Sequence, residues 1–179
     1  LKVITAFQES NLQEMHLNSS TGYGIDEPGR NKIEEIYAKV FKSEDALVRA
    51  QFISGTHALA ITLSALLRPN DTMISITGAP YDTLQTVIGC GKTSSPSSLK
   101  AYGINYEQIE LIENDFDIKT IQERLKQQNV KLIEIQRSRG YSTRNSLTIE
   151  KIEKAIHPAQ TGFTKRMRAN AIKIKATRK

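Results

Sequence analysis

The sequence has one cysteine, no long apolar run, and no histidine spacing that suits a metal ion. The single cysteine, Cys90, excludes an intramolecular disulfide framework and is typical of proteins in the reducing cytoplasm. Every apolar run is far shorter than the roughly 20 residues of a transmembrane helix, so no membrane attachment is predicted. The three histidines, His16, His57 and His157, lack the spacing of a zinc site. With 179 residues, the chain is long enough for one domain with an ordinary core.

Acidic residues are absent from the end of the chain. Residues 157–179 contain seven of the 25 basic residues and no Asp or Glu. The remaining 18 basic and 19 acidic residues give residues 1–156 a formal net charge of −1. The overall charge of +6 therefore describes a basic tail attached to a near-neutral domain. Phe163 is the only aromatic residue of this tail, so its composition favours disorder over nucleic-acid binding.

The body of the chain alternates apolar segments of strand and helix character. Strands are expected at 46–52, 72–77, 106–111 and 130–136, and helices at 33–41, 56–67, 81–88, 118–125 and 149–156. Asp117 and Thr148 are expected to cap the last two helices. Such alternation predicts an α/β fold of three layers, in which helices cover both faces of a parallel sheet. The predicted organisation is an N-terminal segment and helix (1–45), a large domain (46–156) and the tail (157–179).

The strongest local signal is the turn Ser54-Gly55-Thr56, which joins an expected strand to an expected helix. The first backbone N–H groups of a helix have no intrahelical partners and carry partial positive charge. A glycine there lets a phosphate approach these N–H groups closely. The turn therefore predicts a phosphate-binding site, although the same residue types also serve as simple helix caps.

A second glycine-containing segment, Gly89-Cys-Gly-Lys-Thr93, suggests a nucleotide-binding P-loop. A P-loop needs a glycine six positions before its lysine, where this chain has Thr86. The segment also follows an expected helix, whereas a P-loop follows a strand. A flexible loop over residues 89–98 is the better interpretation.

Four segments, in order along the chain, resemble one family. They are Thr21-Gly-Tyr-Gly-Ile-Asp-Glu-Pro-Gly-Arg30, Ile53-Ser-Gly-Thr-His-Ala58, Gly78-Ala-Pro-Tyr-Asp-Thr-Leu84 and Gln136-Arg-Ser-Arg-Gly-Tyr-Ser142. Together they are similar to the methionine gamma-lyase family, whose members include aluminium resistance proteins. That family belongs to the fold type I pyridoxal-phosphate enzymes, near the cystathionine lyases. The resemblance covers roughly residues 3–156 and implies the large, cofactor-binding domain of a carbon–sulfur lyase.

The resemblance implies roles for particular residues. Ser54, Gly55 and Thr56 would hold the phosphate of pyridoxal 5'-phosphate, and Tyr81 would lie on its pyridine ring. Tyr23 and Arg30 would complete the phosphate site of a neighbouring subunit, although they are further apart than the Tyr-x-Arg of related lyases.

A second implied group would bind the amino-acid substrate. Arg137 and Arg139 flank Ser138 after an expected strand, where guanidinium groups bind a carboxylate or a phosphate, or simply lie in solvent. With Tyr141 they form the predicted substrate-binding group.

The resemblance ends near Ile156, before any residue that matches the family's cofactor-binding lysine or the acid beside the pyridine nitrogen. The expectation is an incomplete large domain, truncated, frameshifted or fused to a foreign tail, and inactive by itself. The complete protein is expected to be a cytoplasmic homodimer or homotetramer. The alternative is a non-catalytic protein whose basic tail binds nucleic acid or an acidic partner.

Overall fold

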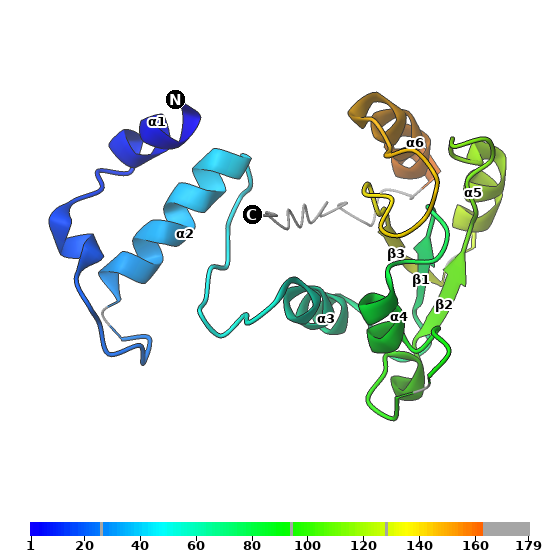
Figure 1. Cartoon of the computed structure of the whole chain (residues 1–179), viewed down its shortest axis with the longest axis horizontal. Coiled ribbons are helices and arrows are strands. Elements are labelled where there is room, and N and C mark those ends of the chain that lie inside the picture. The colour runs from blue at the N-terminus through cyan, green and yellow to red at the C-terminus, as the bar shows by residue number, and fades with distance from the viewer. Residues whose placement is uncertain (26, 94, 128, 163–179) are drawn as a thin grey trace. The chain divides into compact units, whose positions relative to one another are not determined.

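A three-stranded parallel sheet organises the C-terminal part of the chain (Figure 1). The computed structural model describes residues 1–25, 27–93, 95–127 and 129–162. The chain divides into two compact units, residues 1–54 and 55–179. The sheet belongs to the second unit, and helices make up the regular structure described for the first.

The strands are β1 (Thr72–Ser75), β2 (Asn105–Gln108) and β3 (Val130–Glu134), in the spatial order β2-β1-β3. Both pairings are parallel, and Met73 of β1 lies opposite Tyr106 of β2 and Leu132 of β3. All four residues of β1 are buried. A central parallel strand is covered on both faces, which explains why the sequence around β1 is mostly apolar and does not alternate with polar residues.

Helices cover the two faces of the sheet, as the alternating pattern predicted. On one face α3 (Gly55–Leu66) and α4 (Asp82–Ile88) pack around Met73 and Leu132. On the other face α5 (Ile118–Leu125) and α6 (Ile149–Gly162) pack around the fully buried Ile74. The α/β architecture of three layers is therefore confirmed. A short 3₁₀ helix, Lys100–Tyr102, precedes β2.

Local signals fix several helix ends in the second unit. The carboxylate of Asp117 accepts a hydrogen bond from the Thr120 N–H at 3.1 Å, which confirms the predicted cap of α5. The Thr148 hydroxyl accepts from the Lys151 N–H at 3.3 Å at the start of α6. Helix α4 ends at Gly89, whose φ of +89° is a left-handed conformation that favours glycine.

The first unit contains α1 (Lys2–Glu9), the 3₁₀ helix η1 (Glu14–Leu17) and α2 (Pro28–Phe41). Helix α2 includes the predicted helix 33–41 and starts earlier, with Pro28 in its first turn. The carbonyl groups at the end of α1 are satisfied by two lysines of α2. Lys39 donates to the Glu9 carbonyl at 2.9 Å and Lys32 to the Ser10 carbonyl at 2.6 Å.

The predicted strand at 46–52 is wrong, because this segment has no regular structure. Its backbone bonds to a side chain and not to another strand: the Val48 N–H donates to the Glu34 carboxylate of α2 at 2.8 Å. Arg49 forms an ion pair with the same carboxylate. The other three predicted strands are confirmed, although each is shorter than its apolar run. The predicted domain boundaries at 45 and 156 remain predictions.

Within the described residues, none of the helices is long and apolar enough to cross a lipid bilayer. Residues 163–179 of the basic tail lie outside the part of the chain that the structure describes.

The centre of the sheet gives a stability prediction. We expect Ile74→Ala to lower the free energy of unfolding by about 2–5 kcal/mol, because Ile74 is 0% exposed and its loss leaves a cavity. Ile112→Ala is the matched control, since Ile112 is 58% exposed. Urea unfolding followed by circular dichroism measures both changes. Equal losses for the two variants would contradict the assignment of β1 to the core.

Candidate functional site

The N-terminus of α3 opens onto free space beside the start of α4. Apart from the helix's own backbone, no described atom of the second unit lies within 4 Å of a Cβ placed at Gly55, so this unit leaves room for an anion beside the first turn of the helix. The Thr56 hydroxyl lies 3.0 Å from the Thr83 hydroxyl and 3.4 Å from the Tyr81 hydroxyl. The first turns of α3 and α4 therefore lie close together, and the hydroxyls of Thr56, Tyr81 and Thr83 lie between them.

Tyr81 is held at this place by the loop that follows β1. Its side chain packs, half-buried, against the apolar cluster beneath α4 that includes Leu84 and Ile88. Its backbone N–H donates to the Gln136 side-chain oxygen at 2.9 Å. The Gln85 side chain donates to the carbonyl of Pro80. The ring is thus fixed between the end of β1 and the first turn of α4.

Gln136 connects the ends of two strands, and the sequence analysis did not single it out. Its backbone N–H donates to the Thr77 hydroxyl at 3.0 Å, and its side-chain N–H donates to the Ser138 carbonyl at 3.1 Å. Together with the bond to Tyr81, these contacts tie the segment after β3 to the segment after β1. The signal in the sequence was its position at the start of the Gln136–Ser142 motif.

The arginines of the loop after β3 differ in their contacts. Arg144, which the sequence analysis missed, donates to the carbonyls of Gln136 at 2.8 Å and Ser138 at 2.7 Å. Arg137 donates to the Leu147 carbonyl at 3.1 Å. These two guanidinium groups shape the loop. Within the described residues, the Arg139 side chain makes no hydrogen bond or ion pair, and it is exposed.

Tyr141, the third residue of the predicted substrate-binding group, is 95% exposed on the same loop. The structure therefore presents Arg139 and Tyr141 to solvent near the end of β3.

The remaining predicted residues lie in the first unit. Tyr23 is 89% exposed in the segment that precedes α2, and Arg30 lies in the first turn of α2, where its guanidinium borders Gly24. Glu27 orders this segment by accepting hydrogen bonds from the Ser20 hydroxyl at 2.5 Å and the Gly24 N–H at 3.5 Å. The Ser20 bond also lowers the pKa of Glu27.

Ser54 is the last residue of the first unit and directly precedes Gly55. The structure thus brings together Gly55, Thr56 and Tyr81 within the second unit, and leaves Ser54, Tyr23 and Arg30 with the first.

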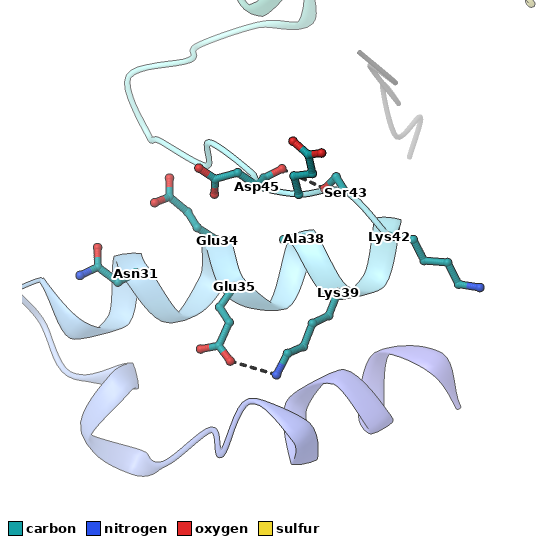
Figure 2. A pocket seen from close by; sticks show the side chains of 9 residues that line it. Asn31, Glu34, Glu35, Ala38, Lys39, Lys42, Ser43 and Asp45 are labelled. Carbon is teal, nitrogen blue, oxygen red and sulfur yellow. Dashed lines mark hydrogen bonds and ion pairs between the residues drawn. The ribbon is translucent and has the colours of Figure 1, made fainter. Parts of the chain in front are cut away.

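A cavity of about 600 Å³ lies in the first unit, along α2 and the residues that follow it (Figure 2). Two of its acidic side chains, Glu34 and Glu35, form ion pairs. Glu35 accepts from Lys39 at 3.0 Å, as Figure 2 shows, and Glu34 pairs with Arg49. The hydrogen bonds from Lys32 and Lys39 lower the pKa of Glu35 to about 2. This cavity is a surface feature of α2 whose lining includes ion pairs, so it is not the candidate site.

A smaller cavity of about 270 Å³ lies in the second unit, at the end of the sheet where the strands begin. Its lining includes Thr72, Asn105 and Asn129, which stand at or just before the amino ends of the three strands. Parallel α/β sheets bind their ligands at the carboxyl ends of the strands. The open N-terminus of α3, beside the segments that follow β1 and β3, is therefore the candidate site.

Comparisons with known proteins show the family of the chain. The family model described as methionine gamma-lyase matches residues 1–169. A solved structure of a candidate cystathionine beta-lyase involved in aluminium resistance, from Clostridium acetobutylicum, is 44% identical with a TM-score of 0.86. The similarity covers 90% of this chain and 39% of that one.

Two further relatives show the same partial coverage. A carbon-sulfur lyase involved in aluminium resistance from Clostridium novyi NT is 42% identical with a TM-score of 0.84, over 90% of this chain and 38% of its own. The uncharacterized protein YnbB of Bacillus subtilis (strain 168) is 39% identical over 96% of this chain and 39% of its own length. The chain belongs to the methionine gamma-lyase family and spans about two fifths of the length of these relatives.

The bridge formed by Gln136 gives a prediction for the site. We expect Gln136→Leu to lower the free energy of unfolding by about 1–3 kcal/mol, because it leaves the Tyr81 N–H without its acceptor. Gln122→Leu on the exposed surface of α5 is the control for the same chemical change. Urea unfolding measures both variants. If Gln136→Leu is no more destabilising than Gln122→Leu, the bridge does not hold Tyr81.

Proposed function

We propose that this chain forms the phosphate-binding and ring-binding part of a pyridoxal-phosphate carbon–sulfur lyase. The observation that carries the proposal is the open N-terminus of α3 at Gly55, with the Thr56 hydroxyl 3.4 Å from the Tyr81 hydroxyl. This arrangement combines an anion-binding helix terminus with an aromatic ring at its edge. The residues present therefore fit a ligand that joins a phosphate to a flat ring.

Each residue of the site has a proposed role. The first N–H groups of α3 and the hydroxyl of Thr56 hold the phosphate, and the Tyr81 side chain lies against the ring. Gln136 fixes the backbone of Tyr81. When bound, pyridoxal phosphate supplies an electron sink that makes the α-proton of an amino acid more acidic.

We propose Arg139, with Tyr141, for the carboxylate of the amino-acid substrate. Arg139 supports this role because its guanidinium is exposed and unengaged among the described residues, whereas Arg137 already holds the Leu147 carbonyl. A guanidinium binds a carboxylate through two parallel hydrogen bonds.

Other properties of the whole protein extend the proposal. A sulfur-containing amino acid as substrate follows from the lyase names of the relatives. Tyr23 and Arg30 are proposed to complete the phosphate site of a second copy in a homodimer or homotetramer. We expect the cofactor-binding lysine and the acid beside the ring nitrogen in the part of the relatives' length that this chain does not span. A cytoplasmic location remains a prediction from the single cysteine.

No observation on the described residues favours the alternative of a binding protein with a basic tail.

The phosphate role of Thr56 is directly testable. We expect Thr56→Val to weaken binding of pyridoxal 5'-phosphate roughly 10- to 100-fold, the effect of about one hydrogen bond to a charged group. Thr62→Val in the same helix is the control, because the Thr62 hydroxyl bonds the Ala58 carbonyl within the helix. Equilibrium dialysis of the full chain measures both affinities. Pyridoxal without the phosphate should bind weakly to the wild type and be insensitive to either change.

The proposal fails if the wild-type chain binds pyridoxal phosphate no better than pyridoxal. It also fails if Thr56→Val and Thr62→Val have the same effect on the affinity.

A further inference from the structure

The side chain of Ser75, at the end of β1, contacts two oxygen atoms at hydrogen-bond distance. Its hydroxyl lies 2.7 Å from the carbonyl of Gly78 and 2.5 Å from the Glu134 carboxyl group at the end of β3. Ser75 is 0% exposed, and Glu134 is half-buried. A buried hydroxyl therefore joins the ends of two neighbouring strands to the turn that follows β1.

A proton count decides the state of Glu134. A hydroxyl donates one hydrogen bond, while a backbone carbonyl and an ionised carboxylate only accept. If Glu134 were ionised, one of the two short oxygen–oxygen contacts would have no proton between its atoms and would be repulsive. Both contacts become hydrogen bonds when Ser75 donates to the Gly78 carbonyl and a protonated Glu134 donates to the Ser75 oxygen.

The surroundings of Glu134 agree with a neutral carboxyl group. It lies on the face of the sheet covered by α3 and α4, two residues after Leu132. Burial raises the pKa of Glu134, against smaller opposing effects of the Ser75 hydrogen bond and of Arg144. Burial raises the pKa of Tyr106 on the neighbouring strand β2, so its phenol is uncharged.

The turn held by Ser75 leads directly to Tyr81. Gly78 has a φ of +77° and donates its N–H to the Ile109 carbonyl at 2.9 Å. A Cβ at this position would collide with the side chain of Glu110. The turn therefore needs glycine, and its carbonyl points back to Ser75.

We propose that Glu134 carries a proton at neutral pH and, through Ser75, fixes the Gly78 turn that positions Tyr81. Glu134 is thus a positioning residue and does not touch the proposed cofactor. Its protonation is independent of the proposed function, and only the consequence for cofactor binding rests on that function.

The pH dependence of stability tests the proton. A carboxyl group whose pKa is raised in the folded state stabilises the fold below its unfolded pKa of about 4.5, and this contribution is lost as the pH rises through the folded pKa. As the pH rises from the unfolded pKa through the folded pKa of Glu134, we expect the melting temperature of the wild type to fall relative to that of E134Q. The amide of E134Q donates to Ser75 at every pH. Glu123→Gln on the exposed surface of α5 is the control and should keep the wild-type profile.

Infrared spectroscopy provides a readout that does not depend on unfolding. At neutral pH the wild-type chain should show the C=O stretching band of one protonated carboxylic acid, and E134Q should lack it. S75A should shift this band, because the acid loses its acceptor. A wild-type spectrum without such a band would overturn the proposal, as would a wild-type pH profile that E134Q reproduces.

Amide hydrogen exchange tests the link to the turn. Protection of the Gly78 and Tyr81 amides should fall about fivefold in S75A, the loss of one ordinary hydrogen bond, and should be retained in E134Q. Unchanged protection in S75A would overturn the positioning role. A change in turn protection without any binding of pyridoxal phosphate by the wild type would refute the proposed function alone.

Discussion

The parallel pairing of β1 between β2 and β3 is the constraint on which the second unit depends. Because all three strands run in one direction, their carboxyl ends share one edge, and the segments that follow β1 and β3 meet there. Burial of β1 on both faces fixes this arrangement, since a register shift would expose or misplace its apolar side chains. The position of Tyr81 beside Gln136 follows from this pairing.

The candidate site uses the backbone more than charged side chains. The N-terminus of α3 provides partial positive charge without a lysine or arginine, and the hydroxyls of Thr56, Tyr81 and Thr83 add uncharged donors. The arginines of the loop after β3 are divided instead between shaping the loop and facing solvent. Of the predicted arginines of this loop, Arg139 is the one whose side chain is exposed and unengaged among the described residues.

Sequence signals located the elements that depend on local chemistry. Interactions within a few residues determine three of these features: the cap at Asp117, the apolar run of β1 and the Ser54-Gly55-Thr56 turn. The predicted strand at 46–52 was wrong because Glu34, far away in sequence, supplies the partner for the Val48 N–H. The bridges made by Gln136 and Glu134 could not be predicted for the same reason, since each spans more than 50 residues.

The proposed function depends on phosphate binding at the N-terminus of α3. Titration of the isotopically labelled chain with pyridoxal 5'-phosphate, followed by amide NMR shifts, tests it most directly. We expect the largest shifts at Gly55, Thr56 and the following amide, with a second group at Tyr81. Shifts concentrated at Thr72, Asn105 and Asn129, or no saturable shifts at all, would contradict it.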